Sequence, residues 1–406
     1  MELMAPAGSF EAMQAAIDSG ANSVYFGVEQ LNMRARASIN FTLDDLDEIA
    51  QRCKEKNVKT YLTLNTIVYD HDLSVIKTVI DRMKSAGIDS VIASDQAVIS
   101  YANTAGVDVH ISTQVNVTNI ETVKFYAHFA NVMVLSRELS LRQIKTICDG
   151  VVKQDVRGPN GELVKIEVFG HGALCMAVSG KCYLSLHTAN SSANRGACVQ
   201  NCRRKYTVKD EEGNELEIDN EYIMSPKDLC TIDFLDQLID TGVSVLKIEG
   251  RGRAADYVSA VIKSYREAID AYYEGTYTEE KVAAWYGNLE KVYNRGFWGG
   301  YYLGQELGEW TNQSGSSATE KKIYLGKGIH YYPKVQIGHF KIEAQKLSVG
   351  DKILITGPTT GAFTTSIEEL LVDDKPATIA KQGDECTFPV EKAIRATDKL
   401  YKLVEA

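Results

Sequence analysis

The sequence predicts an α/β fold in which a (β/α)8 barrel of the TIM type is followed by a small C-terminal β-barrel domain. Short runs rich in β-branched residues alternate with helical segments over roughly the first 275 residues, giving eight strand–helix units. Glycine patterns that bind phosphates or dinucleotides are missing there, which weakens the alternative of a doubly wound open sheet. Beyond residue 320 the pattern changes to alternating strands with glycine turns, which indicates a second, all-β unit.

The barrel elements follow from short apolar runs and from residues that cap helices. Ser9 and Thr42 are side-chain types that cap helix N-termini, and Gly20 and Gly87 suit the left-handed conformation that ends a helix. The expected helices span residues 10–19, 43–56, 72–86, 119–129, 140–148 and 254–273. The expected strands span residues 2–5, 23–27, 58–64, 90–94, 107–112, 131–136, 165–169 and 243–248.

The domain organisation adds two insertions, a linker and a second domain. We expect the barrel domain to span residues 1–275, with a cysteine-rich loop at 170–205 and a β-ribbon at 203–226. Residues 276–320 read as a helical and aromatic linker that packs on the barrel. Residues 321–406 form the small β-barrel domain, with strands at 322–327, 334–339 and 351–356. It is similar to barrels appended to translation factors, so RNA contact and a purely stabilising role are both open.

Composition and charge limit the class of protein. With 406 residues, 44% hydrophobic and 24% charged, the chain can bury a large core and has no long disordered composition. The net charge of −10 is unlike that of a nucleic-acid coat protein, but an RNA-modifying enzyme needs only one basic face. No apolar run approaches membrane-spanning length, and the N-terminus lacks a signal-peptide pattern. We therefore expect a cytoplasmic protein with no membrane partner.

Four of the eight cysteines fall in one stretch, the loop that follows the seventh expected strand. They are Cys175, Cys182, Cys198 and Cys202, separated by six, fifteen and three residues. Four thiolates can hold one iron–sulfur cubane or one zinc ion. The alternatives are buried structural thiols and disulfides, which reducing cytosol disfavours. Structural zinc usually uses Cys-x-x-Cys pairs, which this stretch lacks, yet spacing alone leaves iron–sulfur and zinc equally open.

Polar residues directly follow several expected strands, where the chemistry of a barrel enzyme is found. Arginines at separate strand ends could bind carboxylates through their two-pronged guanidinium groups. The plain alternative is that these residues form structural ion pairs that close the barrel. The strand-end candidates are Arg34, Arg36, Asn65, Ser112, Gln114, Arg137, Glu138, Glu167, His171, Lys247, Glu249 and Arg251.

The cysteine stretch resembles a known family. Glu167, Phe169, Gly172, Cys175, Gly180, Cys182 and Ser185, with the run 194–198 and the closing pair 202–203, are similar to the signature of the collagenase-like peptidase family U-32. The resemblance covers roughly the first three quarters of the chain. Well-understood members hydroxylate RNA bases or quinone rings without oxygen. The resemblance therefore implies a four-iron–four-sulfur (4Fe-4S) cluster and, for the RNA-acting members, prephenate as the hydroxyl donor.

The resemblance also suggests roles for individual residues. The expected cluster ligands are Cys175, Cys182, Cys198 and Cys202. Cys230 is the alternative fourth ligand, because a quinone-pathway member takes its fourth cysteine from the region downstream of the third. The expected catalytic residues are Glu167, His171, Gln114 and Glu249. The expected substrate-binding residues are Arg36, Arg137, Arg251 and Asn65.

The expected function is prephenate-dependent hydroxylation of RNA, forming 5-hydroxyuridine at the tRNA wobble position, with tRNA or rRNA as the partner. The alternatives are rRNA cytidine hydroxylation, quinone-ring hydroxylation, proteolysis, and a cluster-bearing RNA-binding or assembly factor that does no catalysis. The sequence has no serine nucleophile elbow and no His-Glu-x-x-His motif, which counts against a serine or zinc protease.

Overall fold

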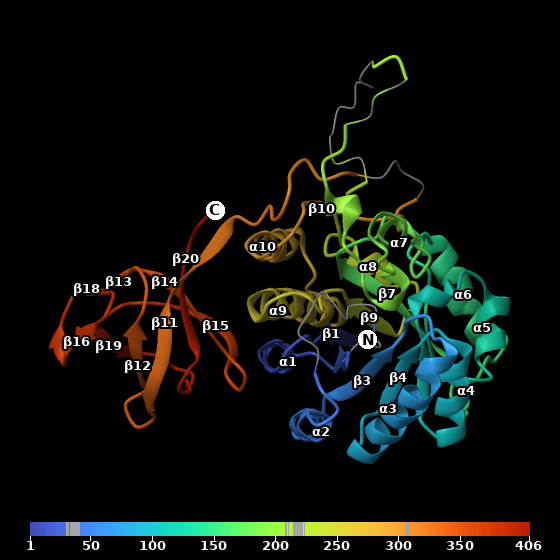
Figure 1. The fold of residues 1–406 in the computed structure, drawn as a ribbon, viewed down its shortest axis with the longest axis horizontal. Helices are drawn as coiled ribbons and strands as arrows, with labels where there is room; N and C mark the ends of the chain where they lie inside the picture. The colour runs from blue at the N-terminus through green and yellow to red at the C-terminus, as the bar shows by residue number, and fades with distance from the viewer. Residues whose placement is uncertain are drawn as a thin grey trace.

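The fold is seen in a computed structural model that describes residues 1–29, 32, 41–207, 209, 211–213, 222, 224–304 and 309–406. The predicted barrel of eight parallel strands is confirmed. Each strand pairs with the next in chain order, and the barrel closes because β7 pairs with β9 and β9 pairs with β1 (Figure 1). The barrel strands are β1 (Glu2–Pro6), β2 (Ser23–Phe26), β3 (Lys59–Leu64), β4 (Ser90–Ala93), β5 (Asp108–Ile111), β6 (Val132–Val134), β7 (Lys165–Gly172) and β9 (Val245–Ile248).

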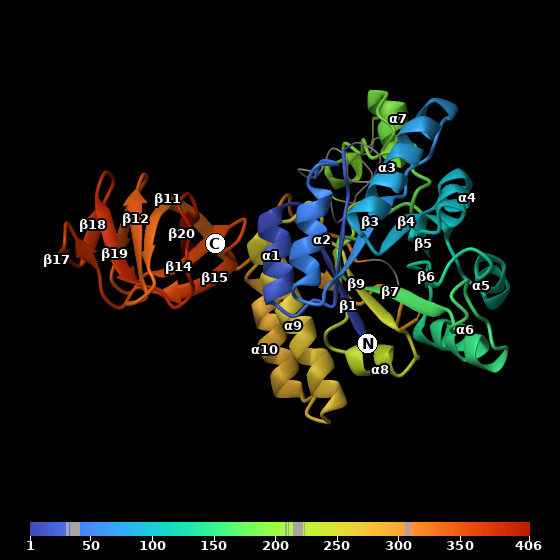
Figure 2. The same cartoon turned by 90° about the horizontal axis from the view of Figure 1, so that it is seen from below.

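Helices surround the barrel and bury their apolar faces against it (Figures 1 and 2). Ser9 caps the first helix as expected, since its hydroxyl accepts a 3.2 Å hydrogen bond from the backbone N–H of Ala12. Gly87 ends α3 with a φ of 79°. The surrounding helices are α1 (Phe10–Asp18), α2 (Leu46–Lys54), α3 (Leu73–Ala86), α4 (Gln96–Ala105), α5 (Ile120–Tyr126), α6 (Leu141–Lys153), α8 (Leu235–Ile239), α9 (Ala255–Tyr273) and α10 (Glu279–Glu290).

Three helix predictions need correction. The helix expected from residue 43 begins at Leu46, because the backbone N–H and hydroxyl of Thr42 both donate to the Asp45 carboxylate, at 2.7 and 2.8 Å, and form a turn before the helix. No helix was expected between β4 and β5, but α4 lies there, capped by Asp95. The helix α6 runs on to Lys153, beyond the predicted end at residue 148.

The sheet continues past the barrel on the side of β7. Strand β8 (Asp228–Cys230) pairs antiparallel with the end of β7, and β10 (Phe297–Trp298) pairs with β8. Neither strand was predicted from the sequence. The expected β-ribbon at 203–226 lies largely outside the described residues.

Two glycines let the cysteine-rich loop leave the barrel at its mouth. A Cβ atom at Gly170 would stand 2.7 Å from the Leu246 side chain, and the register between β7 and β9 shifts at this point. Gly172 has a φ of 105°, and a Cβ there would stand 2.5 Å from the Glu249 carbonyl oxygen. Larger residues at either position would push β7 away from β9, so the loop would leave in another direction.

The C-terminal domain is an antiparallel β domain around its own core, in which the rings of Phe340 and Phe388 stack 4.6 Å apart. It packs on α1 and α9 through a small apolar cluster that includes Ala15, Ala255 and Leu354 (Figures 1 and 2). Its main sheet has the order β15–β14–β20–β11–β12–β19–β16–β17, beside a β13–β18 pair. The strands are β11 (Glu320–Tyr332), β12 (Ile337–Ile342), β13 (Lys346–Ser348), β14 (Lys352–Gly357), β15 (Gly361–Ser366), β16 (Leu371–Val372), β17 (Lys375–Pro376), β18 (Ile379–Lys381), β19 (Glu385–Pro389) and β20 (Lys399–Glu405).

Among the described residues, no helix is both long enough and apolar enough to span a membrane.

Candidate active site

A cavity of about 290 Å³, here called the inner cavity, lies at the C-terminal ends of the barrel strands. Its polar wall comes from several separate strands, as the sequence predicted. Apolar side chains, including Phe169 and Met176, complete the wall. The polar lining residues that follow or end barrel strands are Asn65 (β3), Ser112 and Gln114 (β5), Arg137 (β6), and Lys247, Glu249 and Arg251 (β9).

A buried ion pair lies beneath the inner cavity. The Lys247 ammonium donates to Glu167 Oε1 at 2.8 Å, and neither side chain is more than 6% exposed. His110 Nδ1 lies 3.7 Å from the other carboxylate oxygen, Oε2. The ammonium also lies 4.4 Å from the centre of the Tyr25 ring.

Lys247 and Glu167 hold opposite charges in a largely buried site. Burial lowers the pKa of Lys247, and the attraction of Glu167 offsets only part of this effect. Burial alone would raise the pKa of Glu167, but Lys247 and His110 outweigh it, so the pKa of this carboxyl is lowered. Lys247 lines the cavity and Glu167 does not, so the cavity presents the cation to a bound molecule.

Two arginines supply further positive charge. Arg137 donates to the Ala173 carbonyl at 2.7 Å, and its guanidinium lies 3.7 Å from the centre of the Phe169 ring. Its Nε is buried and has no hydrogen-bond partner among the described residues. Arg251 is 5% exposed and donates to Thr63 Oγ1 at 2.7 Å and to Asn32 Oδ1 at 2.9 Å. The inner cavity is thus lined by three cationic side chains, Arg137, Lys247 and Arg251, against one acidic side chain, Glu249, and suits an anionic ligand.

Neutral polar groups line the side of the inner cavity near β3 and β5. The amide of Asn65 donates to Ser112 Oγ and to Gln114 Oε1, each at 3.3 Å, and the Ser112 hydroxyl donates to the same oxygen of Gln114. These bonds hold the amide of Gln114 in one orientation. Gly180 lets the cysteine-rich loop approach, because a Cβ there would stand 2.7 Å from the Gln114 side chain.

All four predicted ligand cysteines line the inner cavity, whereas Cys230 does not. Burial raises the pKa of Cys202, and the charges of Cys175, Cys198 and Cys182 contribute to the rise, as expected of thiols that lie near one another. Cys230 is buried beside Tyr265, with Sγ 3.8 Å from the Tyr265 hydroxyl, and burial raises its pKa to about 12.

The four thiols could hold a metal group. All four are free and line the inner cavity. Four thiolates are the donor set of a four-iron cluster and also of a structural zinc ion, so the residues present fit either group.

Hydrogen bonds, most of them partly buried, fix the cysteine-rich loop over the barrel mouth. Arg195 forms an ion pair with Asp72 at 2.7 Å and donates to the Ile67 carbonyl at 3.0 Å. The backbone N–H of Cys182 donates to Asn194 Oδ1 at 3.0 Å. Arg203 donates to the Leu174 carbonyl at 2.6 Å, next to the first cysteine. The loop is thus tied both to the β3–α3 connection and to its own base.

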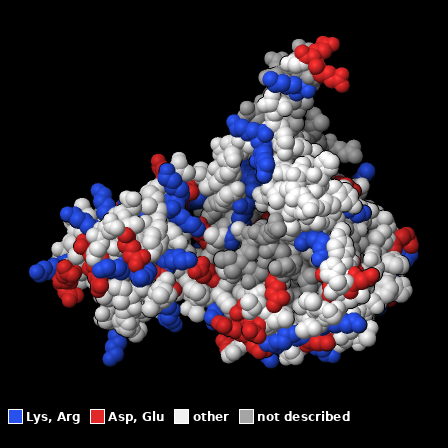
Figure 3. Space-filling view, viewed as in Figure 1, with Lys and Arg blue, Asp and Glu red and all other residues white. Residues whose placement is uncertain are grey.

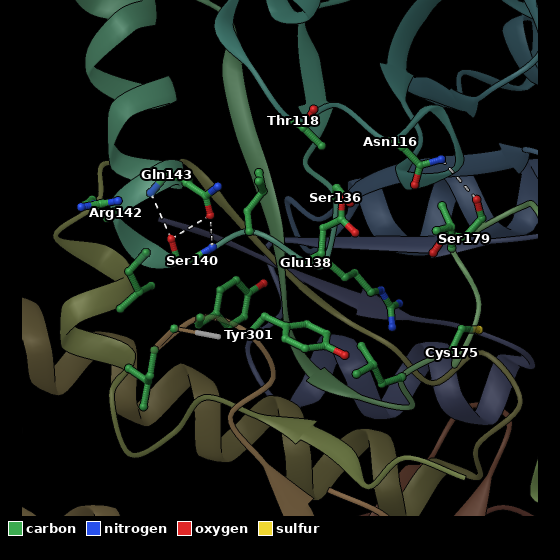
Figure 4. Close-up of a pocket in the computed structure, with 18 of the residues that line it drawn as sticks. Asn116, Thr118, Ser136, Glu138, Ser140, Arg142, Gln143, Cys175, Ser179 and Tyr301 are labelled. Atoms are coloured by element: carbon green, nitrogen blue, oxygen red, sulfur yellow. Dashed lines mark hydrogen bonds between the residues drawn. The ribbon is translucent and has the colours of Figure 1, made fainter. Parts of the chain in front are cut away.

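A larger and more open cavity of about 1350 Å³, here called the outer cavity, lies beside the inner one. Residues 136–143, from the connection after β6 into the first turn of α6, form one wall. Residues 174–179 of the cysteine-rich loop and residues 301–304 form the others. Figure 4 shows Asn116, Ser179 and Cys175 on one side and Ser140, Arg142 and Gln143 on the other. The two cavities share Arg137 and residues 175–179, so Cys175 lies at their common wall.

The predicted catalytic residues do not all line the inner cavity. Gln114 and Glu249 line the inner cavity, and Glu167 supports Lys247 beneath it. His171 lines neither cavity, so its side chain cannot contact a ligand bound there, as its predicted catalytic role would require. Among the predicted substrate-binding residues, Asn65, Arg137 and Arg251 line the inner cavity, and Arg36 lies outside the described residues.

Two functional residues had no assigned role from the sequence. Lys247 was one of several polar residues at strand ends, and His110 was an undistinguished residue within a strand. A charged lysine inside a strand that is otherwise buried was the available signal for Lys247, because such a residue needs a partner. No comparable signal marked His110, since its role depends on the position of Glu167 in another strand.

His171 lies in an aromatic cage behind the strand ends. Its ring is 2% exposed and contacts the rings of Tyr257, Tyr265 and Phe297 at centroid distances of 6.1, 5.5 and 5.4 Å. Burial, with a smaller effect from Arg253, lowers the pKa of His171 to about 3. The folded protein therefore keeps this ring neutral.

Comparison with known proteins gives a match to one family model and three informative relatives. The sequence matches the model of peptidase family U32 over residues 8–312. A protein of Porphyromonas gingivalis named collagenase is 54% identical, over 99% of this chain and 97% of its own length. The tRNA hydroxylation protein P1 of Bacillus subtilis is 30% identical, over 92% of this chain and 87% of its own. A 23S rRNA 5-hydroxycytidine synthase of Escherichia coli is 30% identical, over 91% of this chain and 55% of its own.

The neutral His171 predicts a loss of stability in acid. An unfolded histidine has a pKa of about 6.5, so below that pH the unfolded chain binds a proton that the folded protein excludes. Between about pH 7 and about pH 5 this site should lower the free energy of unfolding by about 2 kcal/mol. In urea unfolding, His171→Gln should lose this part of the pH dependence, while the exposed control His187→Gln should keep it. Equal pH dependence in parent and His171→Gln would show that His171 is not held neutral.

Proposed function

This chain belongs to peptidase family U32, and from that premise we propose that it hydroxylates an RNA base without molecular oxygen. The observation that carries the proposal is the inner cavity, where four free cysteines and a cationic wall face the same space. A site for a redox cluster thus adjoins a site for a small anion. The relatives named for tRNA and rRNA hydroxylation support RNA as the substrate.

Prephenate is the proposed hydroxyl donor, bound in the inner cavity. It carries two carboxylates, and the inner cavity is lined by the cations Arg137, Lys247 and Arg251. Glu167 holds the Lys247 ammonium in place, and Asn65, Ser112 and Gln114 offer neutral hydrogen-bonding groups opposite. The residues of this chain thus bind and orient the donor and keep water from the cavity floor.

The outer cavity is the proposed place for the RNA base. At about 1350 Å³ it has room for a nucleotide, which the inner cavity would not accept together with the donor. Uracil and cytosine offer hydrogen-bonding edges, and Asn116, Ser136 and Gln143 offer matching side chains along the walls. The wobble uridine of tRNA is the proposed target and rRNA cytidine the alternative. Because the cavities share residues 175–179, a base and a donor would meet beside Cys175.

The proposed 4Fe-4S cluster would be held by Cys175, Cys182, Cys198 and Cys202. When bound there, it supplies electron transfer next to the donor cavity. The protein's part is to fix the loop, through the Arg195–Asp72 ion pair and the bond from Cys182 to Asn194.

Proteolysis is the competing function, because a relative 54% identical over nearly the whole chain is named collagenase. A cysteine protease needs a histidine beside its nucleophile. All seven histidines are described, and none of them lines the inner or the outer cavity. The site therefore supports hydroxylation better than peptide cleavage.

Deleting the gene from its host should remove one hydroxylated nucleoside from cellular RNA. We expect 5-hydroxyuridine to disappear from tRNA hydrolysates examined by mass spectrometry, because the enzyme that places the hydroxyl group on the base is missing. The parent gene should restore it, and a gene encoding Cys198→Ala should not. An unchanged nucleoside profile in both tRNA and rRNA would contradict the proposal.

Replacing each candidate fourth ligand in turn should show whether Cys202 or Cys230 binds the cluster. Anaerobically purified parent protein should contain about four iron atoms per chain, the number in one cubane. Cys202→Ala should lose most of this iron, because three ligands hold a cubane poorly, while Cys230→Ala should keep it. Iron and sulfide analysis with absorption spectra measures both. Iron lost only from Cys230→Ala, or stoichiometric zinc in a colourless parent, would refute the assignment.

A further inference from the structure

The cysteine-rich loop has an unusual charge for this acidic protein. The chain as a whole carries 54 acidic and 44 basic residues, yet residues 172–209 contain no Asp or Glu and six Lys or Arg. In Figure 3, Lys and Arg side chains follow one another along the projecting segment, green in Figure 1, toward the barrel. Asp and Glu gather at its tip and along the lower edge of the molecule. An anionic partner is therefore attracted to this side of the mouth.

We propose that this side of the mouth binds a single-stranded segment of RNA, with unpaired bases stacked on Tyr69 and Tyr183. The surface, here called the docking face, consists of Tyr69, Lys181, Tyr183, Leu186 and Arg204. The inference rests on the proposed function, in that RNA is taken as the substrate, and it adds where and how the strand is held.

The segments that carry the residues of the docking face are linked to one another by contacts. Tyr69 lies under the Arg195 guanidinium, 4.1 Å from its ring centre, and Arg195 neighbours Asn194 in the loop. Asn194 accepts a bond from the backbone N–H of Cys182, and Tyr183 follows directly, at the start of α7 (Leu184–Ala189). The amide of Asn201 donates to the Thr188 hydroxyl, which joins α7 to the segment leading to Arg204.

Apolar and aromatic side chains are exposed on this face. Tyr183 is 68% exposed, Tyr69 48% and Leu186 39%. Met176 and Val178, about half exposed, continue the apolar surface to the inner cavity, which both of them line. Aromatic rings in this setting stack with unpaired bases of any sequence, whereas duplex RNA keeps its bases inside the helix.

Cationic side chains on the docking face that are not bound within the protein could contact phosphate groups. Arg195 is neutralised by Asp72, and Arg203 is committed to the Leu174 and Pro226 carbonyls, so neither is available. Lys181 and Arg204 are exposed. The exposed histidines His71 and His187 belong to the same two segments as Tyr69 and Tyr183. Asp70 is an exposed carboxylate at the edge next to Tyr69. An RNA strand whose bases stack on the tyrosines would thus contact cationic side chains mainly on the α7 side.

A binding experiment with two RNAs tests the docking face. One probe is a hairpin with an unpaired loop, and the other is a duplex with the same number of phosphates; affinity is measured by fluorescence anisotropy at several salt concentrations. The parent should bind the hairpin more tightly. Tyr183→Ala should bind it about fivefold to a hundredfold more weakly, the effect of losing one stacked base, and Tyr183→Trp should restore binding. Lys181→Ala should reduce the slope of affinity against salt by about one phosphate contact.

Matched controls separate this inference from the proposed function. Phe125→Ala removes an aromatic ring that is 60% exposed on α5, outside the docking face, and should leave RNA affinity unchanged. Prephenate affinity and iron content should be the same in Tyr183→Ala and parent. Equal binding of hairpin and duplex, unaltered affinity in Tyr183→Ala, or displacement of RNA by a collagen-like peptide would overturn the inference. RNA binding that depends on Tyr183 without any hydroxylated product would instead reject the proposed function alone.

Discussion

The buried ion pair between Glu167 and Lys247 is the interaction on which the rest of the site depends. It joins β7 to β9, the two strands whose pairing completes the barrel, at an Nζ–Oε1 distance of 2.8 Å. Beyond these residues β7 leads into the cysteine-rich loop and β9 leads to Glu249 and Arg251. Removing one partner of a buried pair typically costs about 3–5 kcal/mol, because it leaves a charge without compensation. The ion pair therefore fixes the loop that follows β7 and the residues that follow β9 in position relative to each other.

The same pair determines which charge the cavity presents. The carboxylate of Glu167 faces the barrel interior and His110, while the Lys247 ammonium lines the inner cavity with Arg137. A small anion would thus meet cations at the floor and thiols at the roof. The family also contains proteins named collagenases, and a peptide could approach the same mouth. Lys247 and Arg137 at the inner cavity would suit an anionic donor better than a neutral peptide bond.

The barrel could be predicted from the sequence because its buried strands are short apolar runs, whose positions depend on local pattern alone. The start of α2 could not, since it depends on how Asp45 accepts hydrogen bonds from Thr42. The four cavity cysteines were suggested by their clustering, and the position of Cys230 behind β7 required the three-dimensional fold. His171 resembled a site residue in sequence. In the fold, however, the register of β7 shifts after Phe169, and the His171 ring lies among aromatic rings.

The most direct test of the account is an anaerobic reaction of cluster-containing protein with RNA and prephenate whose ring hydroxyl carries a heavy oxygen isotope. Mass spectrometry of the digested RNA then reports whether the isotope reaches a base. The account predicts a hydroxylated nucleoside that carries the label, and little product from Lys247→Ala protein that retains its iron. An unlabelled hydroxylated nucleoside would contradict prephenate as the donor. Unmodified RNA together with cleavage of a collagen substrate by the same preparation would contradict the hydroxylation function itself.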